Sequence, residues 1–475
     1  MANYNLIIGG MQIETDSYFD VVNPATETVV GRCPAASAEQ LDQAVSAARE
    51  AYAGWSQTSS LERKKALLDI ADKLESDFEN LARLVTQEQG KPLNAYAGMG
   101  SRFEVGGAIA WCRATAEMEL SVKVLQDTEE ARIALYRKPL GVVASITPWN
   151  WPLLIAIWHV MPALRTGNTV VIKPSSLTPL STLRFVELAN EVLPAGVLNV
   201  VTGEGGLGRS ITSHPGIDKI VFTGSTPTGK TIMQSAATNL KRLTLELGGN
   251  DAGIVLPDVD PKQVAPKLFA AAFSNSGQTC AALKRLYVHD DIYDAICDAL
   301  VAIAKSVNVG NGLEEGIDYG PVQNADQLRE VLELAESARA DGGRFLTGGE
   351  VNPAQKGYFY PITLVADIKD GSRLVDEEPF GPILPIIRYS DIDEVIERAN
   401  NNPNGLGGSV WSADIEKATE LVKRLECGSG WVNSHGNVQP NVPFGGVKQS
   451  GVGVEFGIEG LEEYTTIQAV NISKR

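Results

Sequence analysis

One cysteine of this chain lies in a turn of small residues that follows an apolar helical run. Residues 268–273 form the run, residues 274–279 form the turn, and Cys280 and Ala281 come next. Gly277 permits backbone angles that other residues resist, and the small neighbours leave the sulfur approachable. This pattern predicts a nucleophilic thiol. A buried structural cysteine is the alternative, because a free cysteine also packs as a small hydrophobe.

An asparagine lies between two tryptophans and two prolines at the end of a predicted strand. The segment is Pro148-Trp149-Asn150-Trp151-Pro152. The prolines stiffen the loop, and an amide that stabilises an oxyanion must be aimed before the reaction begins. Asn150 is therefore a candidate oxyanion donor. A hydrophobic plug with a capping asparagine is the alternative.

Two glutamates occupy positions that suit acid–base or ligand chemistry. Glu246 follows an apolar strand and precedes two glycines, where partial desolvation raises a carboxyl pKa toward that of a general base. Its alternative is a salt-bridged strand end. Glu378 lies with Phe380 in a proline-rich turn that is suited to gripping hydroxyl groups. Its alternative is a solvated acidic loop.

Two glycine-rich turns compete for a dinucleotide. Residues 203–208 read Gly-Glu-Gly-Gly-Leu-Gly, but no acidic residue follows at the usual distance of about 20 positions. In the other turn, Gly224 ends a strand, Ser225 follows, and Pro227 fits the first turn of a helix. Backbone N–H groups at that helix start would face a pyrophosphate. We favour the second turn, and an ordinary loop is the alternative for either.

The size and charge of the chain limit the classes of protein it can belong to. Its 475 residues are too many for a single hydrophobic core, since such cores stop growing at roughly 250–300 residues. The net charge of −17 argues against nucleic acid and anionic membranes as partners. Five scattered cysteines without a CxxC pair predict a reducing cytosol with neither disulfides nor a metal site. We expect no signal peptide, no membrane span and a cytoplasmic location.

Short apolar β-rich runs alternate with helix-length segments after residue 141, which is typical of parallel strands buried on both faces. The first series of predicted strands is 142–147, 169–173, 198–202, 219–223 and 243–247, with helices near 152–166, 182–193, 206–213 and 227–238. The second series is 252–256, 285–289, 362–365, 383–387, 408–411 and 430–433. The N-terminal part predicts a hairpin, 6–8 with 11–13, and helices beginning near residues 38, 60 and 77.

These patterns predict an α/β fold with three parts. Residues 1–119 and 141–247 form a Rossmann-type cofactor-binding domain, and residues 248–430 form an α/β catalytic domain. Residues 120–140 and 464–475 read as strands with uncovered edges, which predicts a small β oligomerisation element.

The motifs together resemble the NAD(P)-dependent aldehyde dehydrogenase superfamily. The resemblance rests on six motifs in the family's order, which cover nearly the whole chain. They are Pro148-Trp149-Asn150, Phe222-Thr-Gly224-Ser225, Glu246-Leu-Gly-Gly249, Gly277-Gln-Thr-Cys280, Glu377-Glu-Pro-Phe380-Gly-Pro382 and Pro443-Phe-Gly-Gly-Val-Lys-Gln-Ser-Gly451.

The resemblance implies an aldehyde dehydrogenase-like fold and a role for each motif. Cys280 matches the nucleophile that forms a thiohemiacetal, Asn150 matches the oxyanion donor, and Glu246 matches the base that activates water against the thioester. Glu455 lies where some members have a second carboxylate in a proton path. The residues that match cofactor contacts are Ile146, Trp149, Lys173, Ser176, Gly224, Ser225, Glu378 and Phe380.

Departures from the family's pattern bear on the cofactor and the substrate. Ser176 stands where NAD-preferring members often have a glutamate that repels a 2′-phosphate, so we expect use of both NAD and NADP. Trp158 stands where semialdehyde-oxidising members often have an arginine. The residues that match the lining of the family's substrate tunnel are Trp151, Ile155, Trp158, Ser274, Thr279, Ala281 and Val438.

This set of tunnel residues predicts medium-to-large apolar or aromatic aldehydes as substrates. A betaine-aldehyde-type enzyme is an alternative, since aromatic rings cradle a trimethylammonium group. A coenzyme A-acylating enzyme is another, although such members generally lack the base at Glu246. An abundant structural protein on the same fold is a third. The family assembles as homodimers or homotetramers.

Overall fold

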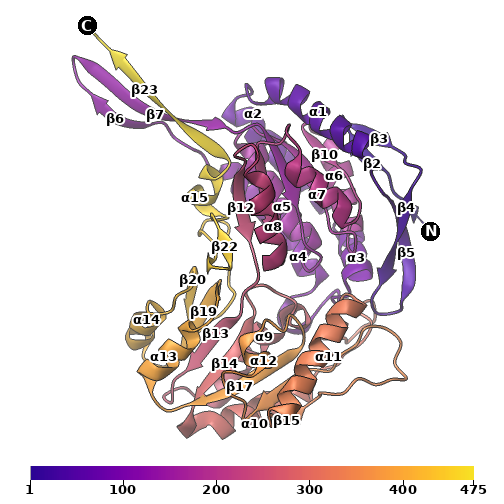
Figure 1. Ribbon diagram of the computed structural model, residues 1–475, viewed down its shortest axis with the longest axis vertical. Helices are drawn as coiled ribbons and strands as arrows, with labels where there is room; N and C mark the ends of the chain where they lie inside the picture. Colours follow the sequence, from indigo (N-terminus) through magenta and orange to yellow (C-terminus); the bar gives the residue numbers. More distant parts are fainter. Residues whose placement is uncertain (1) are drawn as a thin grey trace.

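Two sheets of buried strands organise the structure, a computed structural model that describes residues 2–475 (Figure 1). The first sheet contains β2 (Leu6–Ile8), β3 (Met11–Ile13), β8 (Val142–Ile146), β9 (Thr169–Lys173), β10 (Leu198–Val200), β11 (Lys219–Thr223), β12 (Arg242–Glu246) and β22 (Gly451–Val452). Its order is β22-β12-β11-β8-β9-β10-β2-β3, and the pairs from β12 to β10 are parallel.

The second sheet is parallel over six of its seven strands. It contains β13 (Asp251–Val255), β14 (Leu283–His289), β15 (Arg344–Thr347), β16 (Thr363–Ala366), β17 (Ile383–Tyr389), β19 (Gly407–Trp411) and β20 (Ser429–Val432). Its order is β15-β16-β17-β14-β13-β19-β20, and only the pair of β15 with β16 is antiparallel. The predicted α/β class is confirmed, and the predicted strands of both series are present to within about two residues at each end.

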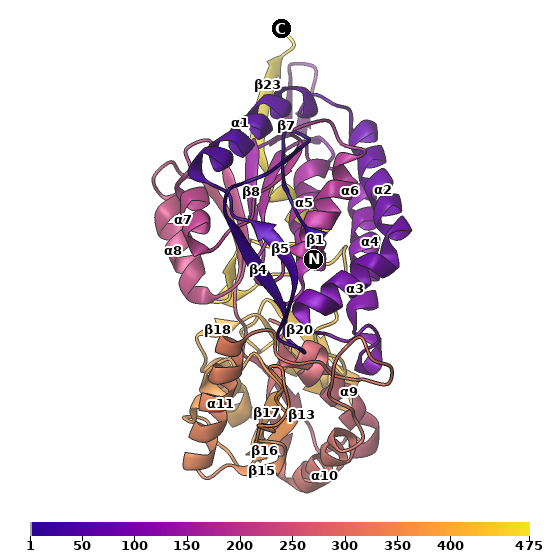
Figure 2. The ribbon, with the colours of Figure 1, turned by 90° about the vertical axis from the view of Figure 1, so that its right-hand side faces the viewer.

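Helices cover both faces of the first sheet, as Figure 2 shows. The helices of this half are α1 (Ala38–Trp55), α2 (Ser60–Ser76), α3 (Phe78–Gln89), α4 (Ser101–Glu117), α5 (Pro152–Arg165), α6 (Leu180–Asn190), α7 (Gly205–Ser213) and α8 (Thr226–Ala236). One buried cluster packs α2 to α6 on one face, and another packs α1, α7 and α8 on the other. Two buried faces explain why the central strands are continuous apolar runs.

The second sheet is sandwiched in the same way. Its helices are α9 (Pro261–Phe273), α10 (Tyr293–Ala304), α11 (Ala325–Ala340), α12 (Arg373–Asp376), α13 (Ile392–Asn400) and α14 (Ile415–Val422). One cluster packs α11, α13 and α14, and the other packs α9 and α10.

Local sequence signals set several helix boundaries. Ser37 and Ser59 form capping boxes with the residues three positions on, Gln40 and Glu62, at the starts of α1 and α2. Gly90 ends α3 with a φ of 99°, a left-handed conformation that glycine adopts without strain. The predicted N-terminal helices and hairpin are therefore confirmed.

Two features of the N-terminal half were absent from the sequence prediction. Helix α4 contains Gly106 and Gly107, which lower helix propensity by about 1 kcal/mol each relative to alanine. Strands β4 (Tyr18–Asn23) and β5 (Thr28–Pro34) form a small sheet with β1 (Ala2–Asn3). Asp20 and Gly31 interrupt the apolar alternation that identifies a strand.

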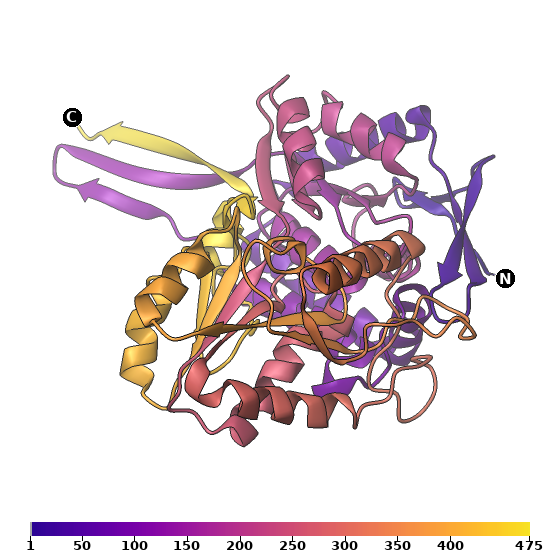
Figure 3. The same cartoon turned by 60° about the horizontal axis from the view of Figure 1, so that its bottom comes forward.

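Three antiparallel strands form an arm that extends away from both sheets (Figure 3). They are β6 (Lys123–Asp127), β7 (Ala131–Pro139) and β23 (Thr465–Ser473), and the sheet order is β23-β7-β6. The remaining strands and α-helix of the described residues are β18 (Asn404–Gly405), β21 (Val447–Lys448) and α15 (Gly457–Glu462). The strands predicted in residues 120–140 and 464–475 are thus paired with each other, and the C-terminus lies at the tip of the arm.

The chain crosses directly from one sheet to the other between β12 and β13. Because β8, β9, β11 and β12 are parallel, their carboxyl ends share one edge of the first sheet. The loops before β14 and β17 lie at the amino-end edge of the second sheet. Loops from these two edges meet in the candidate site.

Candidate active site

The turn before Cys280 has an unusual backbone. Asn275, Ser276 and Gly277 adopt φ values of 52°, 56° and 75°, three consecutive left-handed residues. A Cβ on Gly277 would lie 2.2 Å from the carbonyl oxygen of Gly381, so only glycine fits. Such strain persists only where the surroundings impose it, and it clusters at functional sites. Gln278 is fully buried and bonds to the Asn275 carbonyl (2.9 Å), which ties the turn together.

The loop that carries Asn150 is hydrogen-bonded to this turn. The Asn150 side chain is 3% exposed, and its Nδ2 donates to the Gln278 carbonyl oxygen at 3.0 Å. The Trp151 indole N–H donates to Thr279 Oγ1 at 3.1 Å. The structure therefore brings together two motifs that lie about 130 residues apart in the sequence.

Glu246, the last residue of β12, is a buried carboxylate that forms no ion pair with any described residue. It is 3% exposed, and within residues 2–475 neither of its oxygens has a hydrogen-bond partner. Burial raises its pKa well above the usual 4.5, and the carboxylate of Glu455 adds to the rise. Strand β22 pairs with β12 at Glu246 and so brings Glu455 to the same place.

A buried histidine, His159, lies next to Glu455. His159 Nε2 lies 3.1 Å from Glu455 Oε1 and 3.0 Å from Thr223 Oγ1, and its Nδ1 lies 3.0 Å from Ser145 Oγ. The four histidines of the sequence form no recognisable motif, so His159 could not be singled out without the fold.

Burial also governs the reactivity of the cysteine. It raises the pKa of the Cys280 thiol to about 12, while the nearby Lys284 ammonium opposes the rise. Lys284 Nζ donates to the carbonyl oxygens of Cys280 (2.7 Å) and Gly249 (2.9 Å) and to Glu378. Sequence reasoning did not identify Lys284. Its spacing, four residues after the cysteine at the start of β14, was the available signal.

The Glu378 turn lies against the same loops. The Glu378 carboxylate accepts a bond from the Gly249 N–H at 3.3 Å, and a Cβ on Gly248 would lie 2.2 Å from its second oxygen. The Phe380 ring meets the Trp149 ring edge-on at 5.3 Å between centroids. Glu378, Phe380 and Trp149 are therefore gathered beside the cysteine turn.

The remaining predicted cofactor residues lie at the carboxyl edge of the first sheet. Ser225 is the N-cap of α8, and its hydroxyl bonds to Thr228 Oγ1 (2.9 Å). No side chain of the described residues caps the first amides of α8, so these N–H groups can bind an anion. Lys173 ends β9, and its Nζ donates to the Pro174 carbonyl. The residues at the ends of β8, β9 and β11 or in the following loops are Ile146, Lys173, Ser176, Gly224 and Ser225.

An aromatic cluster lies beside the sulfur. Trp158, Trp111 and Phe456 pack against one another with centroid separations of 4.7, 5.5 and 5.6 Å. The cluster also contains Cys280, Ala281, Leu406, Trp431, Val438 and Phe444. The sequence prediction included Trp158, Ala281 and Val438 but missed Trp111 and Phe456. Trp111 comes from α4, a helix that was itself not predicted.

The other predicted tunnel residues occupy different positions. Trp151 and Thr279 bond to each other, and Thr279 Oγ1 also donates to the Ser274 carbonyl at 3.3 Å. The Ser274 hydroxyl is buried without a hydrogen-bond partner in the described part of the chain. Ile155 belongs to the large core of α2 to α6 and not to the cluster around the sulfur.

Among residues 2–475, no group of three or more His, Cys, Asp or Glu side chains could hold a metal ion. None of the described helices is long and apolar enough to cross a membrane.

Comparisons with known proteins agree over nearly the full length. The model of the aldehyde dehydrogenase family matches residues 12–470. A phenylacetaldehyde dehydrogenase from Pseudomonas fluorescens is 40% identical, with 99% of this chain and 96% of that protein aligned. The NAD⁺ complex of a Bacillus cereus aldehyde dehydrogenase has a TM-score of 0.96 at 35% identity, covering 99% and 97% of the two chains. An NADP-dependent enzyme from E. coli has a TM-score of 0.96 at 33% identity, covering 99% and 98%.

Proposed function

The chain belongs to the aldehyde dehydrogenase family, and we propose that it oxidises arylalkyl aldehydes of the phenylacetaldehyde type to carboxylic acids. Aldehyde dehydrogenases are oxidoreductases, and the family assignment extends over residues 12–470. The observation that carries the substrate class is the cluster of Trp158, Trp111 and Phe456 beside Cys280. An aryl ring gains edge-to-face contacts there in addition to its area burial.

Three side chains would perform the chemistry. The Cys280 sulfur attacks the aldehyde carbon, and the carbonyl oxygen becomes an oxyanion next to the Asn150 amide. One hydrogen of Asn150 Nδ2 is used by the Gln278 carbonyl, which leaves the second for the oxyanion. After oxidation a thioester joins the acyl group to Cys280. Glu246 then takes a proton from water, which attacks the thioester and releases the acid.

The pKa values of these groups suit the two half-reactions. A Cys280 pKa raised to about 12 by burial keeps the thiol protonated until a base removes its proton. The raised pKa of Glu246 makes that carboxylate a stronger base than an exposed glutamate. The pair of Glu455 and His159 offers the released proton a path away from Glu246.

The residues at the sheet edges fit a nicotinamide dinucleotide. The uncapped amides of α8 suit the pyrophosphate, Lys173 suits the adenosine ribose, and Glu378 suits the nicotinamide ribose. When bound, the dinucleotide supplies the acceptor for the hydrogen and electron pair that leave the substrate carbon. Ser176 carries no charge against a 2′-phosphate, and we therefore propose use of both NAD⁺ and NADP⁺.

A panel of aldehydes assayed with both cofactors tests this proposal. We expect kcat/KM for phenylacetaldehyde to exceed that for acetaldehyde by at least about tenfold, because one methylene in an apolar pocket is already worth 10-fold or more. Cys280→Ala should have no dehydrogenase activity. Equal kcat/KM for both aldehydes would contradict the substrate class, and an NAD⁺ preference above about a hundredfold, or about 2.7 kcal/mol, would contradict dual use.

The same panel separates the alternatives. Betaine aldehyde should be a poor substrate, because the seven residues matched to the substrate tunnel include no acidic side chain to balance its positive charge. Acyl transfer to coenzyme A should not compete with hydrolysis, because Glu246 is present. A preference for betaine aldehyde, or a dependence on coenzyme A, would assign the alternative function.

We also propose that the arm pairs with a second copy of this chain. Its outer strands, β6 and β23, have edges that the described residues leave uncovered, and an exposed sheet edge favours pairing with another strand. Leu125 and Ile467 are 55% and 54% exposed on these strands. Ile467→Lys should therefore lower the oligomeric state in analytical ultracentrifugation, while an unchanged mass would contradict the proposal.

A further inference from the structure

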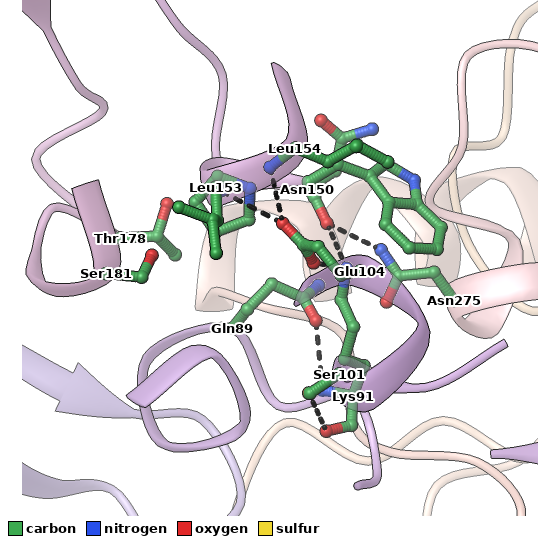
Figure 4. Close-up of polar contacts among 12 residues, drawn as sticks. Gln89, Lys91, Ser101, Glu104, Asn150, Leu153, Leu154, Thr178, Ser181 and Asn275 are labelled. Carbon is green, nitrogen blue, oxygen red and sulfur yellow. Dashed lines mark hydrogen bonds and ion pairs between the residues drawn. The ribbon is translucent and has the colours of Figure 1, made fainter. Parts of the chain in front are cut away.

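A fully buried ion pair lies next to the loop that carries Asn150. Lys91 Nζ and Glu104 Oε2 are 2.5 Å apart, and neither side chain has any exposed area. Lys91 follows α3, whereas Glu104 is in the first turn of α4 (Figure 4). None of the six motifs includes either residue.

Each member of the pair makes a directional contact with the segment that carries Asn150. Lys91 Nζ donates to the Asn150 carbonyl oxygen at 2.8 Å and lies 3.5 Å from the centre of the Trp151 ring. Glu104 Oε1 accepts from the backbone N–H groups of Leu153 (2.9 Å) and Leu154 (3.2 Å). Figure 4 shows these bonds converging on the loop from one side.

These contacts replace the local interactions that would otherwise hold the start of α5. Pro152 has no N–H, and the N-cap Trp151 has no side-chain oxygen, so the helix cannot cap itself. Glu104 caps it from another helix. The carbonyl oxygen of Asn150 is thus held by Lys91 and by Asn275 Nδ2, a second donor at 2.9 Å, and the helix start that follows Asn150 is held by Glu104.

Stability alone does not explain a sealed ion pair. Removing two charges from water costs free energy that their attraction often fails to recover, and apolar side chains of similar volume often serve as well. Apolar side chains, however, form no directional hydrogen bonds that could fix the orientation of the loop. An oxyanion donor misplaced by 1 Å can lose about a hundredfold in rate, so direction matters at Asn150.

We propose that Lys91 and Glu104 are positioning residues that aim the Asn150 amide at the oxyanion. Neither touches the reacting atoms: Lys91 acts through the backbone carbonyl of Asn150, and Glu104 acts through the helix start that follows it. The inference rests on the proposed role of Asn150. It is therefore tested on a reaction that needs the oxyanion donor but neither an aldehyde nor a dinucleotide.

Acylation of Cys280 by p-nitrophenyl acetate is such a reaction. The sulfur forms a bond to the acyl carbon, the thiol proton passes to a base, and p-nitrophenolate leaves. We expect Asn150→Ala to slow the acylation burst by about 10²–10³-fold, the usual loss for one oxyanion donor. Lys91→Met with Glu104→Gln, which leaves no unpaired charge, should slow it about 10–100-fold.

Three controls distinguish positioning from a general structural effect. Lys219→Met removes another fully buried lysine, one that donates to Thr244 Oγ1 at 2.6 Å, and should leave the burst rate within about twofold of wild type. Alkylation of Cys280 by iodoacetamide forms no oxyanion, so its rate should not change in the Lys91/Glu104 variant. Adding Asn150→Ala to that variant should cause no loss beyond that of Asn150→Ala alone, because coupled effects are not additive.

The opposite results would overturn the inference. A Lys91/Glu104 variant that acylates as fast as Lys219→Met would do so, and so would losses that multiply with Asn150→Ala. If Asn150→Ala itself acylates at the wild-type rate, both the inference and the proposed role of Asn150 fail. If acylation behaves as expected but no aldehyde is oxidised, only the proposed function fails.

Discussion

Two buried glutamates, Glu104 and Glu246, have opposite surroundings. Glu104, next to the Asn150 loop, binds a lysine and two backbone amides. Glu246 has no hydrogen-bond partner within residues 2–475 and faces a second carboxylate, Glu455. Both carboxylates are buried, so their partners decide how they behave. A carboxylate with partners holds the structure, whereas one without partners binds a proton more tightly and becomes a stronger base.

The strongest test of this comparison exchanges each glutamate for its uncharged isostere and measures turnover. Glu246→Gln should lower kcat by about 10²–10⁴-fold, because the base that activates water is lost. Reduced cofactor should still appear in a burst of about one equivalent per subunit, since oxidation precedes hydrolysis. Steady turnover by Glu246→Gln near the wild-type rate would show that the unpaired carboxylate is not the base.

Stability should respond in the reverse order. Lys91→Met leaves Glu104 buried without its cation and should lower the free energy of unfolding by about 3–5 kcal/mol. Glu246→Gln should not lower it, because glutamine resembles the protonated acid that burial favours. Denaturant titrations of both variants measure the difference, and a larger loss for Glu246→Gln would reverse the comparison.

The pH dependence of stability provides a third test. The pKa of Glu246 is raised in the folded chain above its ordinary 4.5, so between these two values the folded state binds more protons. Stability therefore falls as the pH rises through this window, by up to about 1.4 kcal/mol per pH unit. Glu246→Gln should remove this pH dependence, so the stability of the variant relative to the wild type should increase as the pH rises. Parallel melting-temperature curves for both proteins from pH 4.5 upward would contradict it.

Replacing Lys284 should have the smallest effect of these predictions. Its surroundings are intermediate between those of Glu104 and those of Glu246. It pairs with Glu378, which is 20% exposed, and it opposes the burial-induced rise in the Cys280 pKa. Lys284→Met should slow alkylation of Cys280 by about tenfold at fixed pH, because the thiol loses the cation that opposes the rise in its pKa. Lys91→Met combined with Glu104→Gln serves as the matched control and should leave that rate unchanged. Equal slowing in both would mean that alkylation reports general damage.

The elements that could be predicted are those whose signal is local. The runs 169–173 and 219–223 each contain three consecutive apolar strand-forming residues, and the structure has strands at β9 and β11 with these same bounds. Cys280, Asn150 and Glu246 each lie in a short motif, so the sequence alone selected them. Helix α4 escaped prediction because its two glycines weaken the propensity on which such predictions depend.

The parts of the site that could not be predicted are those assembled by packing. Trp111 and Phe456 lie 345 positions apart in the chain and meet only because α4 and the segment after β22 both approach Cys280. Lys91, Glu104 and Lys284 read as ordinary charged residues, because no local pattern reveals that a charge is sealed from water.

The sequence by itself therefore determined the α/β class, the family and the three side chains proposed for the chemistry, since these follow from local apolar runs and short motifs. Only the tertiary structure decided which glutamate is paired and which is not, because desolvation and distance are properties of the folded chain. Burial and the nearby Glu455 raise the pKa of Glu246, whereas the paired Lys91 holds the loop of Asn150 by a hydrogen bond.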